Sequence, residues 1–317
     1  MKTKKILSMI SMLLIVVMAF VGCANNDNGK ESSSEQGQQS EQEQQQQEQP
    51  EQPSSNFDAN SDITVVARDT ASGTRGAFHE LMEIKVKEGD TEVDKLVVGA
   101  LEFDGTDKVI TAVEGDKYGI GYISLGSVSE RIAAASVNGV EATVDNVKSG
   151  AYAVARPFLL VTKGTESDLV KDFISFTESV QGQKIVEEKN YIASVEGPVE
   201  YTASGLSGTI KVAGSTSVTP LMEKLQEVYK ELNPNVEFEM QSNGSSQGIK
   251  AAIDGSYDIG MSSRDLKDDE KAELNEHVLA IDGIAVILNK ENPTTDISSE
   301  NITKIYTGEI TKWSEVK

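Results

Sequence analysis

Cysteine and histidine are scarce in this chain, and their scarcity excludes several kinds of site. A single cysteine, Cys23, occurs in 317 residues, so no intrachain disulfide can form. The two histidines, His79 and His277, lie far apart in the sequence, and neither has a second histidine or a cysteine at the spacing of zinc ligands. We therefore expect packing or surface roles for both histidines and no metal site.

Signatures of common enzyme classes are also missing. A serine hydrolase needs a nucleophile in a tight turn together with a partner histidine, and we expect neither histidine to serve. No Gly-Lys-Ser/Thr signature occurs, so the lysine and the metal ligand that nucleotide hydrolysis requires are absent from the sequence. The chain is expected not to be an enzyme and to need no cofactor.

Positive charge is in the minority, with 29 Lys and Arg against 51 Asp and Glu and a formal net charge of -22. A field of this sign argues against nucleic acid and anionic membrane surfaces as partners. It does not exclude a small anion as ligand, because local donors and helix ends hold a buried oxyanion and salt screens the distant charges.

The N-terminal segment has the pattern of a secretory signal. Three lysines precede an almost continuous apolar run over residues 6–20, and Val21-Gly22-Cys23 ends it. The run is short for a membrane span, so residues 1–23 are expected to be a signal peptide. Cys23 ends a sequence that resembles a lipobox, which predicts lipidation at Cys23 and anchoring at the extracytoplasmic face of the membrane. A plain signal peptide and an uncleaved anchor are the alternatives.

Residues 24–61 are rich in Gln, Glu, Ser and Asn and have almost nothing apolar to bury. Such a composition predicts a disordered tether between a lipid and a folded body. A binding segment is the alternative interpretation.

Small hydroxyl-bearing turns follow several of the expected strands. Ser72-Gly73-Thr74 lies between a strand near residues 63–66 and a helix, and Arg68 lies just before it. Such turns place free N–H groups, hydroxyl donors and closely approaching backbone in front of a helix, and an arginine adds a planar cationic fork. Three more such turns are Gly214 to Pro220, Asn243 to Gly248 and Met261 to Arg264. In open α/β sheets ligands bind at the carboxyl ends of strands, so an anion site is predicted there.

Strand and helix patterns alternate along the rest of the chain, which predicts an α/β fold. Helices are expected at 74–85, 106–114, 167–180, 182–189, 220–232, 246–253 and 268–274. Further strands are expected at 118–123, 158–162, 209–212, 236–240, 257–260 and 284–288.

Taken together, these turns resemble those of the phosphate-binding lipoproteins that serve high-affinity phosphate ABC importers. The resemblance implies a two-lobed periplasmic-binding-protein-like (type II) fold with the ligand cleft between the lobes. The segments that carry it are Ala213 to Val218, Gly244 to Ser246, Asp258 to Arg264, Tyr306 to Trp313 and Ser72 to Phe78.

The order of these segments differs from the order in that family. Residues 63 to about 196 resemble the later part of a family member, and residues 208–317 resemble the earlier part, which predicts a circular permutation. One lobe would then be continuous, residues 157–286, and the other would combine residues 62–156 with residues 287–317. The first and last residues of the folded body should lie close together in this second lobe.

The resemblance also assigns roles to individual residues. Thr216, Ser217 and Ser245 would donate to phosphate from one lobe, while Ser72, Gly73 and Thr74 would close from the other and Arg68 would supply charge. Ser263 lies where some relatives have a carboxylate, which accepts the proton of hydrogen phosphate and repels sulfate. Asp69 is either a substitute for that carboxylate or the ion-pair partner of Arg68.

The expected function is therefore the capture of inorganic phosphate outside the cytoplasm and its delivery to the membrane permease of an ABC importer. The protein is expected to be a monomer that is held at the membrane by its N-terminal lipid and does not bind nucleic acid. The alternatives are a surface oxyanion sensor or adhesin without transport, and a binder of another tetrahedral oxyanion such as sulfate.

Overall fold

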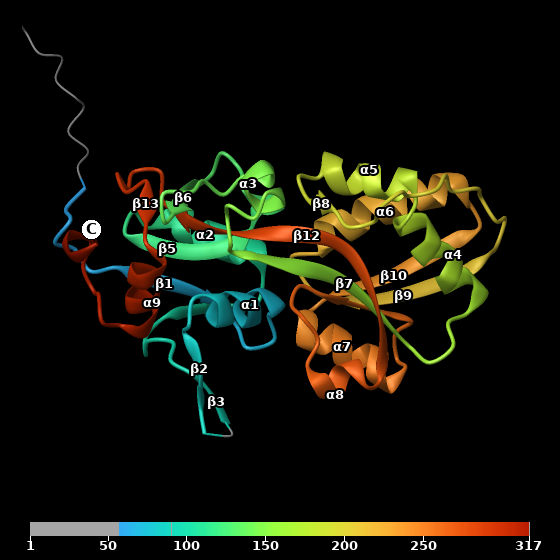
Figure 1. Cartoon of the computed structure of the whole chain (residues 1–317), viewed down its shortest axis with the longest axis horizontal. Coiled ribbons are helices and arrows are strands. Elements are labelled where there is room, and N and C mark those ends of the chain that lie inside the picture. Colours follow the sequence, from blue (N-terminus) through green and yellow to red (C-terminus); the bar gives the residue numbers. More distant parts are fainter. Residues whose placement is uncertain (1–56, 90, 317) are drawn as a thin grey trace, which may run out of the picture. The chain divides into compact units, whose positions relative to one another are not determined.

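The computed structural model describes residues 57–89 and 91–316, so the predicted signal peptide, Cys23 and residues 24–56 of the predicted tether lie outside the described residues. Strands and helices alternate along this part (Figure 1), which confirms the α/β fold class. No helix among residues 57–89 and 91–316 is both long and apolar enough to cross a membrane.

The elements have the following bounds. The strands are β1 Thr64–Arg68, β2 Lys85–Glu88, β3 Thr91–Asp94, β4 Leu101–Phe103, β5 Gly119–Ser124, β6 Ala133–Val137, β7 Ala155–Lys163, β8 Ile192–Ala193, β9 Gly208–Gly214, β10 Val236–Ser242, β11 Ile259–Ser262, β12 Leu274–Leu288 and β13 Asp296–Ile297. The helices are α1 Gly73–Leu81, α2 Thr106–Gly115, α3 Val144–Lys148, α4 Asp168–Thr177, α5 Val180–Glu188, α6 Thr219–Leu232, α7 Ser245–Asp254, α8 Asp268–Lys271 and α9 Ser299–Thr307, with 3-10 turns at Leu125–Ser127 and Trp313–Glu315.

One mixed sheet has the strand order β10-β9-β11-β7-β12-β5-β1-β4. β9 pairs in parallel with β10 and β11, and β1 pairs in parallel with β4 and β5. The two long strands in the middle, β7 and β12, are antiparallel to each other, and β12 is also antiparallel to β5. β6 and β8 pair with β12, and β2 and β3 form a separate hairpin.

Among the described residues, four hydrophobic clusters, two on each side, divide this sheet and its helices into two lobes, which appear at opposite ends of the sheet in Figure 1. Lobe one contains β9–β11 and α4–α8, and its core includes Phe158, Phe173 and Tyr229. Lobe two contains β1–β6 with α1–α3 and α9, and its core includes Phe78 and Tyr306. Each lobe therefore has its own packed interior, and the β7 and β12 strands connect the two.

The crossing between the lobes lies near Gly283. β12 pairs with β7 as far as Gly283 and with β5 from Ile284 onward, and Ile284 and Val286 pack in the core of lobe two. Sequence analysis put this limit after Val286, three residues later. The predicted limit was carried over from the family resemblance, whereas in the structure the crossing lies where β12 changes partner from β7 to β5.

The first and last described residues of the body lie side by side, as the sequence predicted. The backbone N–H of Ile63 donates to the carbonyl of Thr311 at 2.8 Å, and Asp62 and Lys312 form an antiparallel bridge. The ring of Phe57 packs against Trp313, with the centroids 6.1 Å apart. Residues 57–61, which sequence analysis assigned to the tether, are therefore part of the folded body, because Phe57 has an aromatic surface to cover.

Local structure differs from the sequence predictions at several points. α1 ends at Leu81, four residues before the expected end, because Glu83 adopts a positive φ of 51° and β2 begins at Lys85. The hairpin of β2 and β3 and the helix α9 were not predicted. Leu274 belongs to β12 instead of ending the short helix α8.

Candidate functional site

The turn after β1 brings a buried arginine to the start of a helix. Arg68 is the last residue of β1, and only 1% of its surface is exposed. The side chain of Ser72 accepts a hydrogen bond from the backbone N–H of Arg75 at 3.4 Å, so Ser72 is the N-cap of α1. The positive end of the α1 dipole therefore begins five residues after Arg68.

Arg68 donates its hydrogen bonds to neutral oxygens. Its Nε donates to the carbonyl of Phe103 at 3.1 Å, and its Nη2 donates to the carbonyl of Asp104 at 3.3 Å and to the hydroxyl of Thr216 at 2.8 Å. Among residues 57–89 and 91–316, no carboxylate lies within 4.0 Å of this guanidinium, so Asp69 is not its ion-pair partner. Burial lowers the pKa of Arg68 from its ordinary value. A buried cation of this kind strongly favours a nearby anion.

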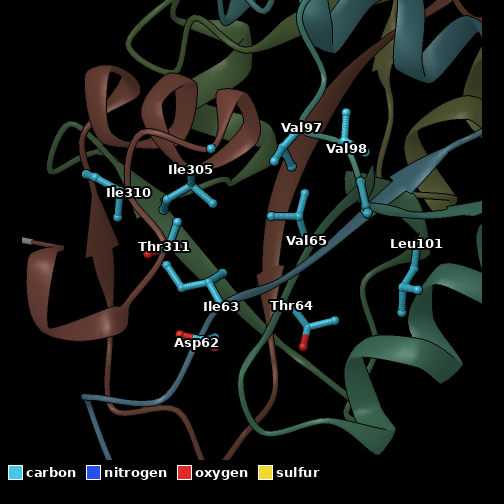
Figure 2. Close-up of a pocket in the computed structure, with 13 residues that line it drawn as sticks. Asp62, Ile63, Thr64, Val65, Val97, Val98, Leu101, Ile305, Ile310 and Thr311 are labelled. Atoms are coloured by element: carbon cyan, nitrogen blue, oxygen red, sulfur yellow. The ribbon is translucent and has the colours of Figure 1, made fainter.

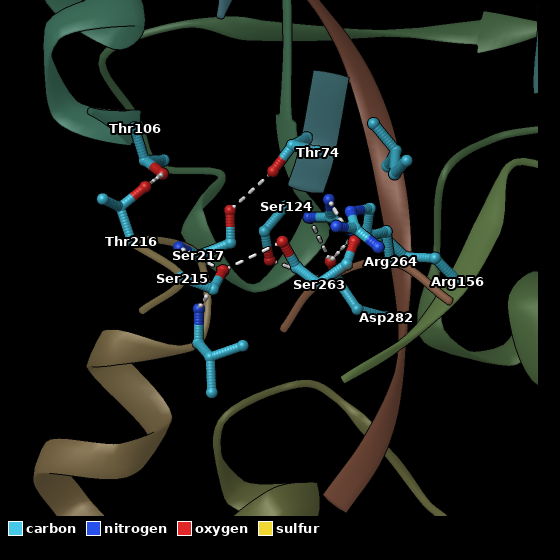
Figure 3. Close-up of polar contacts among 12 residues, drawn as sticks. Thr74, Thr106, Ser124, Arg156, Ser215, Thr216, Ser217, Ser263, Arg264 and Asp282 are labelled. Atoms are coloured by element: carbon cyan, nitrogen blue, oxygen red, sulfur yellow. Dashed lines mark hydrogen bonds and ion pairs between the residues drawn. The ribbon is translucent and has the colours of Figure 1, made fainter. Parts of the chain in front are cut away.

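The other three turns come from lobe one and meet at Ser263. Ser215, in the turn from β9 to α6, donates from its Oγ to the Oγ of Ser263 at 2.9 Å. Ser245, the first residue of α7, has its Oγ 3.2 Å from the same atom. Ser263 follows β11 directly. The three turns thus join their hydroxyls in one group, and Figure 3 shows the contact between Ser215 and Ser263.

Contacts across the lobes complete a hydroxyl cluster, which we define as Arg68, Ser72, Gly73, Thr74, Thr216, Ser217, Ser245, Ser263 and Ser215. Thr74 Oγ1 of lobe two lies 2.9 Å from Ser217 Oγ of lobe one (Figure 3). The backbone N–H of Ser246 donates across the lobes to the carbonyl of Ala71 at 3.1 Å.

Gly73 allows this close approach. A Cβ atom at residue 73 would lie 2.8 Å from Ser245 Cβ and 2.9 Å from Ser263 Oγ, and closer still to Ser245 Oγ. Real side chains do not approach so closely, so the start of α1 reaches the serines of lobe one only because residue 73 is glycine. Three helix N-termini, those of α1, α6 and α7, therefore meet at the cluster, and each favours negative charge.

The structure brings together all the described residues that sequence analysis assigned to the site, while Cys23 lies outside the described residues. Ser72 differs from the others because its hydroxyl is used as a helix cap. Sequence analysis did not assign Ser215, which is 98% buried, or Thr106, whose Oγ1 is 3.5 Å from that of Thr216. Ser215 lies within the predicted turn from Gly214 to Pro220, whereas no sequence pattern distinguishes Thr106.

No carboxylate belongs to the hydroxyl cluster. At Ser263, where the family resemblance places a carboxylate in some relatives, the side-chain hydroxyl contacts the hydroxyls of Ser215 and Ser245. Behind Ser263 lies a buried ion pair between Arg156 and Asp282, which sequence analysis did not find. Burial raises the pKa of Asp282 to about 6, although the guanidinium of Arg156 acts in the opposite direction.

His79 lies behind Arg68 in a fully buried position. Its Nδ1 lies 3.1 Å from the carboxylate of Asp94, and its Nε2 lies 3.3 Å from the hydroxyl of Tyr122, which accepts the backbone N–H of Arg68. The packing role expected for His79 is thus a hydrogen-bonded one. Burial lowers the pKa of His79 to about 4.

The pKa of His79 predicts acid sensitivity. Unfolded chains take up a proton at this histidine near pH 6.5, whereas the folded chain does so near pH 4, so the contribution of His79 to stability is lost as pH falls between these values. Asp282 acts oppositely, because its raised pKa makes the folded chain bind a proton first. We therefore expect the stability difference between the native protein and His79→Gln to shrink by roughly 3 kcal/mol from pH 7 to pH 4. Urea unfolding of both proteins at each pH measures this stability difference. A difference that does not depend on pH would contradict the lowered pKa of His79.

Residues 244–248 have the Gly-x-Ser-x-Gly spacing of a hydrolase nucleophile turn, with Ser246 at the centre, so the interpretation of the turn from Asn243 to Gly248 as lacking this spacing is wrong. His79 and Ser246 line the same hollow of about 290 Å³. However, His79 directs its two ring nitrogens to Asp94 and Tyr122, so it is not bonded to Ser246 as a general base would be. Among the described residues, no group of three or more His, Cys, Asp or Glu side chains could hold a metal ion.

One hollow opens beside the hydroxyl cluster, and another lies apart from it. The first, of about 640 Å³, is lined by Thr106 and Thr216, so it opens next to the hydroxyl cluster. The second, of about 520 Å³, lies in lobe two between β1, the Val97–Leu101 segment and α9 (Figure 2). None of its lining residues belongs to the cluster, so it is a separate feature.

Comparisons with known proteins agree with this geometry. A model of the PBP superfamily domain matches residues 25–180 and 199–317. Phosphate-binding protein PstS 2 of Streptococcus pneumoniae serotype 4 is 42% identical over 264 residues, which cover 83% of this chain and 91% of the relative. The chain belongs to the phosphate-binding proteins of the PBP superfamily. This membership confirms the resemblance that the turns indicated.

Structural similarity extends over the whole of one such protein. The crystal structure of a phosphate ABC transporter phosphate-binding protein from S. pneumoniae TIGR4 matches with a TM-score of 0.67 and 42% identity, covering 81% of this chain and 100% of that one. This match confirms the periplasmic-binding-protein-like fold. A second type of family member matches only in part: phosphate-binding protein PstS of Staphylococcus haemolyticus is 34% identical over 119 residues, which cover 35% of this chain and 38% of the relative.

Proposed function

We propose that this protein captures inorganic phosphate between its two lobes and delivers it to the membrane permease of an ABC importer. The observation that carries the proposal is the buried guanidinium of Arg68, which has no carboxylate partner in the described residues and donates to the carbonyls of Phe103 and Asp104 and to the hydroxyl of Thr216. An oxyanion in this position would neutralise Arg68 and accept hydrogen bonds from Thr74, Ser217 and Ser245. The names of the streptococcal relatives support phosphate as that oxyanion.

The proposal extends to location and ligand residues. The ligands would be Arg68, Ser72, Gly73 and Thr74 from lobe two and Thr216, Ser217, Ser245 and Ser263 from lobe one. Lipidation of Cys23 would hold the protein, as a monomer, at the extracytoplasmic face of the membrane, where a permease of the importer would receive the phosphate. No enzymatic step is part of this function.

Titration calorimetry of the purified protein with phosphate tests the proposal, with sulfate and arsenate as competitors. We expect heat that saturates at one phosphate per chain. Absence of binding at millimolar phosphate would contradict the proposal.

The permuted order of the family segments is part of this proposal, and two observations support it. When two segments are exchanged, a continuous alignment can follow only one of them. This accounts for the staphylococcal match, which covers 35% of this chain and 38% of the relative, whereas the streptococcal match covers 83% and 91%. The contact between Ile63 and Thr311 brings together the ends that a permutation would create. Of the described residues, lobe one would contain 157–283, and lobe two would contain 57–89, 91–156 and 284–316.

Thr216→Val should weaken phosphate binding. The substitution keeps the shape of the side chain but removes the hydroxyl that meets Arg68 and faces the ligand position. The expected loss is roughly 1–3 kcal/mol, or about tenfold to hundredfold in Kd by calorimetry. Thr111→Val is the matched control, because within the described part of the chain the Thr111 hydroxyl bonds only to Arg131, at an exposed site. Equal affinities for the two variants would remove Thr216 from the site.

Ser263→Asp should increase the preference for phosphate over sulfate. A carboxylate at this position would accept the proton of hydrogen phosphate and repel sulfate, which has no proton to donate. The hydroxyls of Ser215 and Ser245 are already within 2.9 and 3.2 Å of the Ser263 hydroxyl and can donate to the new group. The ratio of the two dissociation constants measures the effect. A ratio equal to that of the native protein would show that Ser263 does not face the ligand.

A further inference from the structure

The buried ion pair of Arg156 and Asp282 lies where the chain passes between the lobes. Arg156 is the second residue of β7, and Asp282 is its direct partner on β12, two residues before Ile284 begins the pairing with β5. The side chain of Arg156 is 1% exposed and that of Asp282 is fully buried. Any rotation of one lobe against the other must bend these two strands at or beside this pair.

Hydrogen bonds link the pair to both lobes. Arg156 donates from Nε and Nη2 to Asp282 Oδ2, at 3.2 and 3.0 Å, and from Nη1 to the backbone carbonyl of Ser263 at 3.0 Å. On the other side, Ser124 donates from its Oγ to Asp282 Oδ1 at 2.9 Å. Ser263 belongs to the hydroxyl cluster in lobe one, and Ser124 ends β5 in lobe two. Figure 3 shows this series of contacts from Ser263 through Arg156 and Asp282 to Ser124.

Packing alone does not explain a charged pair at this position. The cost of removing two charges from water often exceeds their attraction, so apolar residues would fill the same space at equal or greater stability. The pair does something that apolar side chains cannot do, because it fixes the peptide plane after Ser263 by a hydrogen bond to its carbonyl. That peptide sets the direction from which the Ser263 side chain enters the cluster.

We propose that Arg156 and Asp282 are positioning residues of the oxyanion site, which hold the Ser263 turn in register with lobe two so that ligand binding and lobe closure occur together. This inference rests on the proposed phosphate-binding function. Ligand binding and lobe closure would thus be coupled through β7 and β12 at the crossing, and not through contacts of this pair with the ligand. The hydrogen bond from Ser124 to Asp282 connects this pair to lobe two.

Asp282→Asn tests the inference in the full chain, with phosphate titration by calorimetry and lobe closure by small-angle scattering at pH 7.5. The variant keeps the size of the side chain but leaves Arg156 without its counter-charge. We expect phosphate affinity to fall at least tenfold and phosphate-induced compaction to be reduced.

Asp172→Asn is the matched control. Asp172, on α4 in lobe one, accepts hydrogen bonds from Tyr201, Ser204 and Tyr229, and among the residues that the structure describes it has no side-chain bond to the cluster or to the crossing. It should lower the midpoint of thermal unfolding without changing phosphate affinity or compaction.

A purely structural role for the pair would give a different result. If Asp282→Asn lowers only the unfolding temperature, as Asp172→Asn should, the inference is overturned while the proposed function stands. If Asp282→Asn does not fold, Ser124→Ala takes its place, since it keeps the ion pair and removes the side-chain link to lobe two, while the backbone contact with Leu125 remains. A severalfold loss of phosphate affinity in Ser124→Ala supports the inference, and native affinity overturns it. No phosphate binding by the native protein would overturn the proposed function and this inference together.

Discussion

Arg68→Met should abolish most of the phosphate affinity while the protein remains folded. The guanidinium is buried and has no carboxylate partner in the described residues, so the ligand would be its counter-ion. Removing one member of a buried, hydrogen-bonded charge pair costs roughly 2–5 kcal/mol, which corresponds to about a thirtyfold to several-thousandfold loss of affinity. Methionine is unbranched and fills most of the space of the arginine stem. Calorimetry gives the affinity, and circular dichroism shows whether the fold is kept.

Arg131→Met is the control for this prediction. Arg131 already has carboxylate partners, Glu114 and Asp107, at the exposed surface of α2, so its loss should leave the phosphate affinity unchanged. The assignment of Arg68 fails if a folded Arg68→Met protein binds phosphate as well as the Arg131→Met protein does.

Gly73→Ala should prevent the lobes from closing on the ligand. The added methyl group would lie within 2.9 Å of Ser263 Oγ and closer to Ser245, so the start of α1 must move away from lobe one. Displacements of about 1 Å at a preorganised site can reduce its activity by about 10²-fold, and we expect a loss of affinity of that order. The variant should also lose the decrease in radius of gyration on phosphate addition, which small-angle scattering measures.

Gly76→Ala, three residues further along the same helix, is the matched control. Its Cβ would meet only Arg264 Cδ, at 3.2 Å, on a flexible side chain that can move. Alanine also favours the helix over glycine at either position, so neither variant should unfold more easily in the absence of phosphate. Equal affinity and equal compaction in the two variants would show that residue 73 does not limit closure.

The sequence predicted which turns lie together, because the signals of such turns are local. Ser72, Gly73 and the turn from Gly214 to Pro220 combine a helix start with small residues, and such turns have the same form wherever they occur. The order of strands and helices also predicts that such turns gather at the carboxyl ends of the strands. The turns that contain Ser215, Ser245 and Ser263 do meet in this way. Closeness between lobes, as between Thr74 and Ser217, came only from the resemblance to the family.

Features that depend on distant partners were missed. Arg156 and Asp282 are 126 residues apart, and neither has a local pattern that distinguishes a buried ion pair from a surface charge. β12 was predicted only over its last third, because its first part alternates with charged residues at the surface of lobe one and resembles a helix end. His79 reads as an ordinary helix residue until Asp94 folds back beside it. Tertiary contacts decide each of these cases, and a single sequence does not contain them in local form.

A crystal structure of the protein grown with phosphate tests the central claim most directly. We expect one phosphate between the lobes, within hydrogen-bonding distance of the Arg68 guanidinium, of Thr74 and Ser217, and of the backbone N–H groups at the starts of α1 and α7. The same crystals should retain the bond of Arg156 to the Ser263 carbonyl. Phosphate bound elsewhere on the protein, or lobes that close at millimolar phosphate with no anion beside Arg68, would contradict the account.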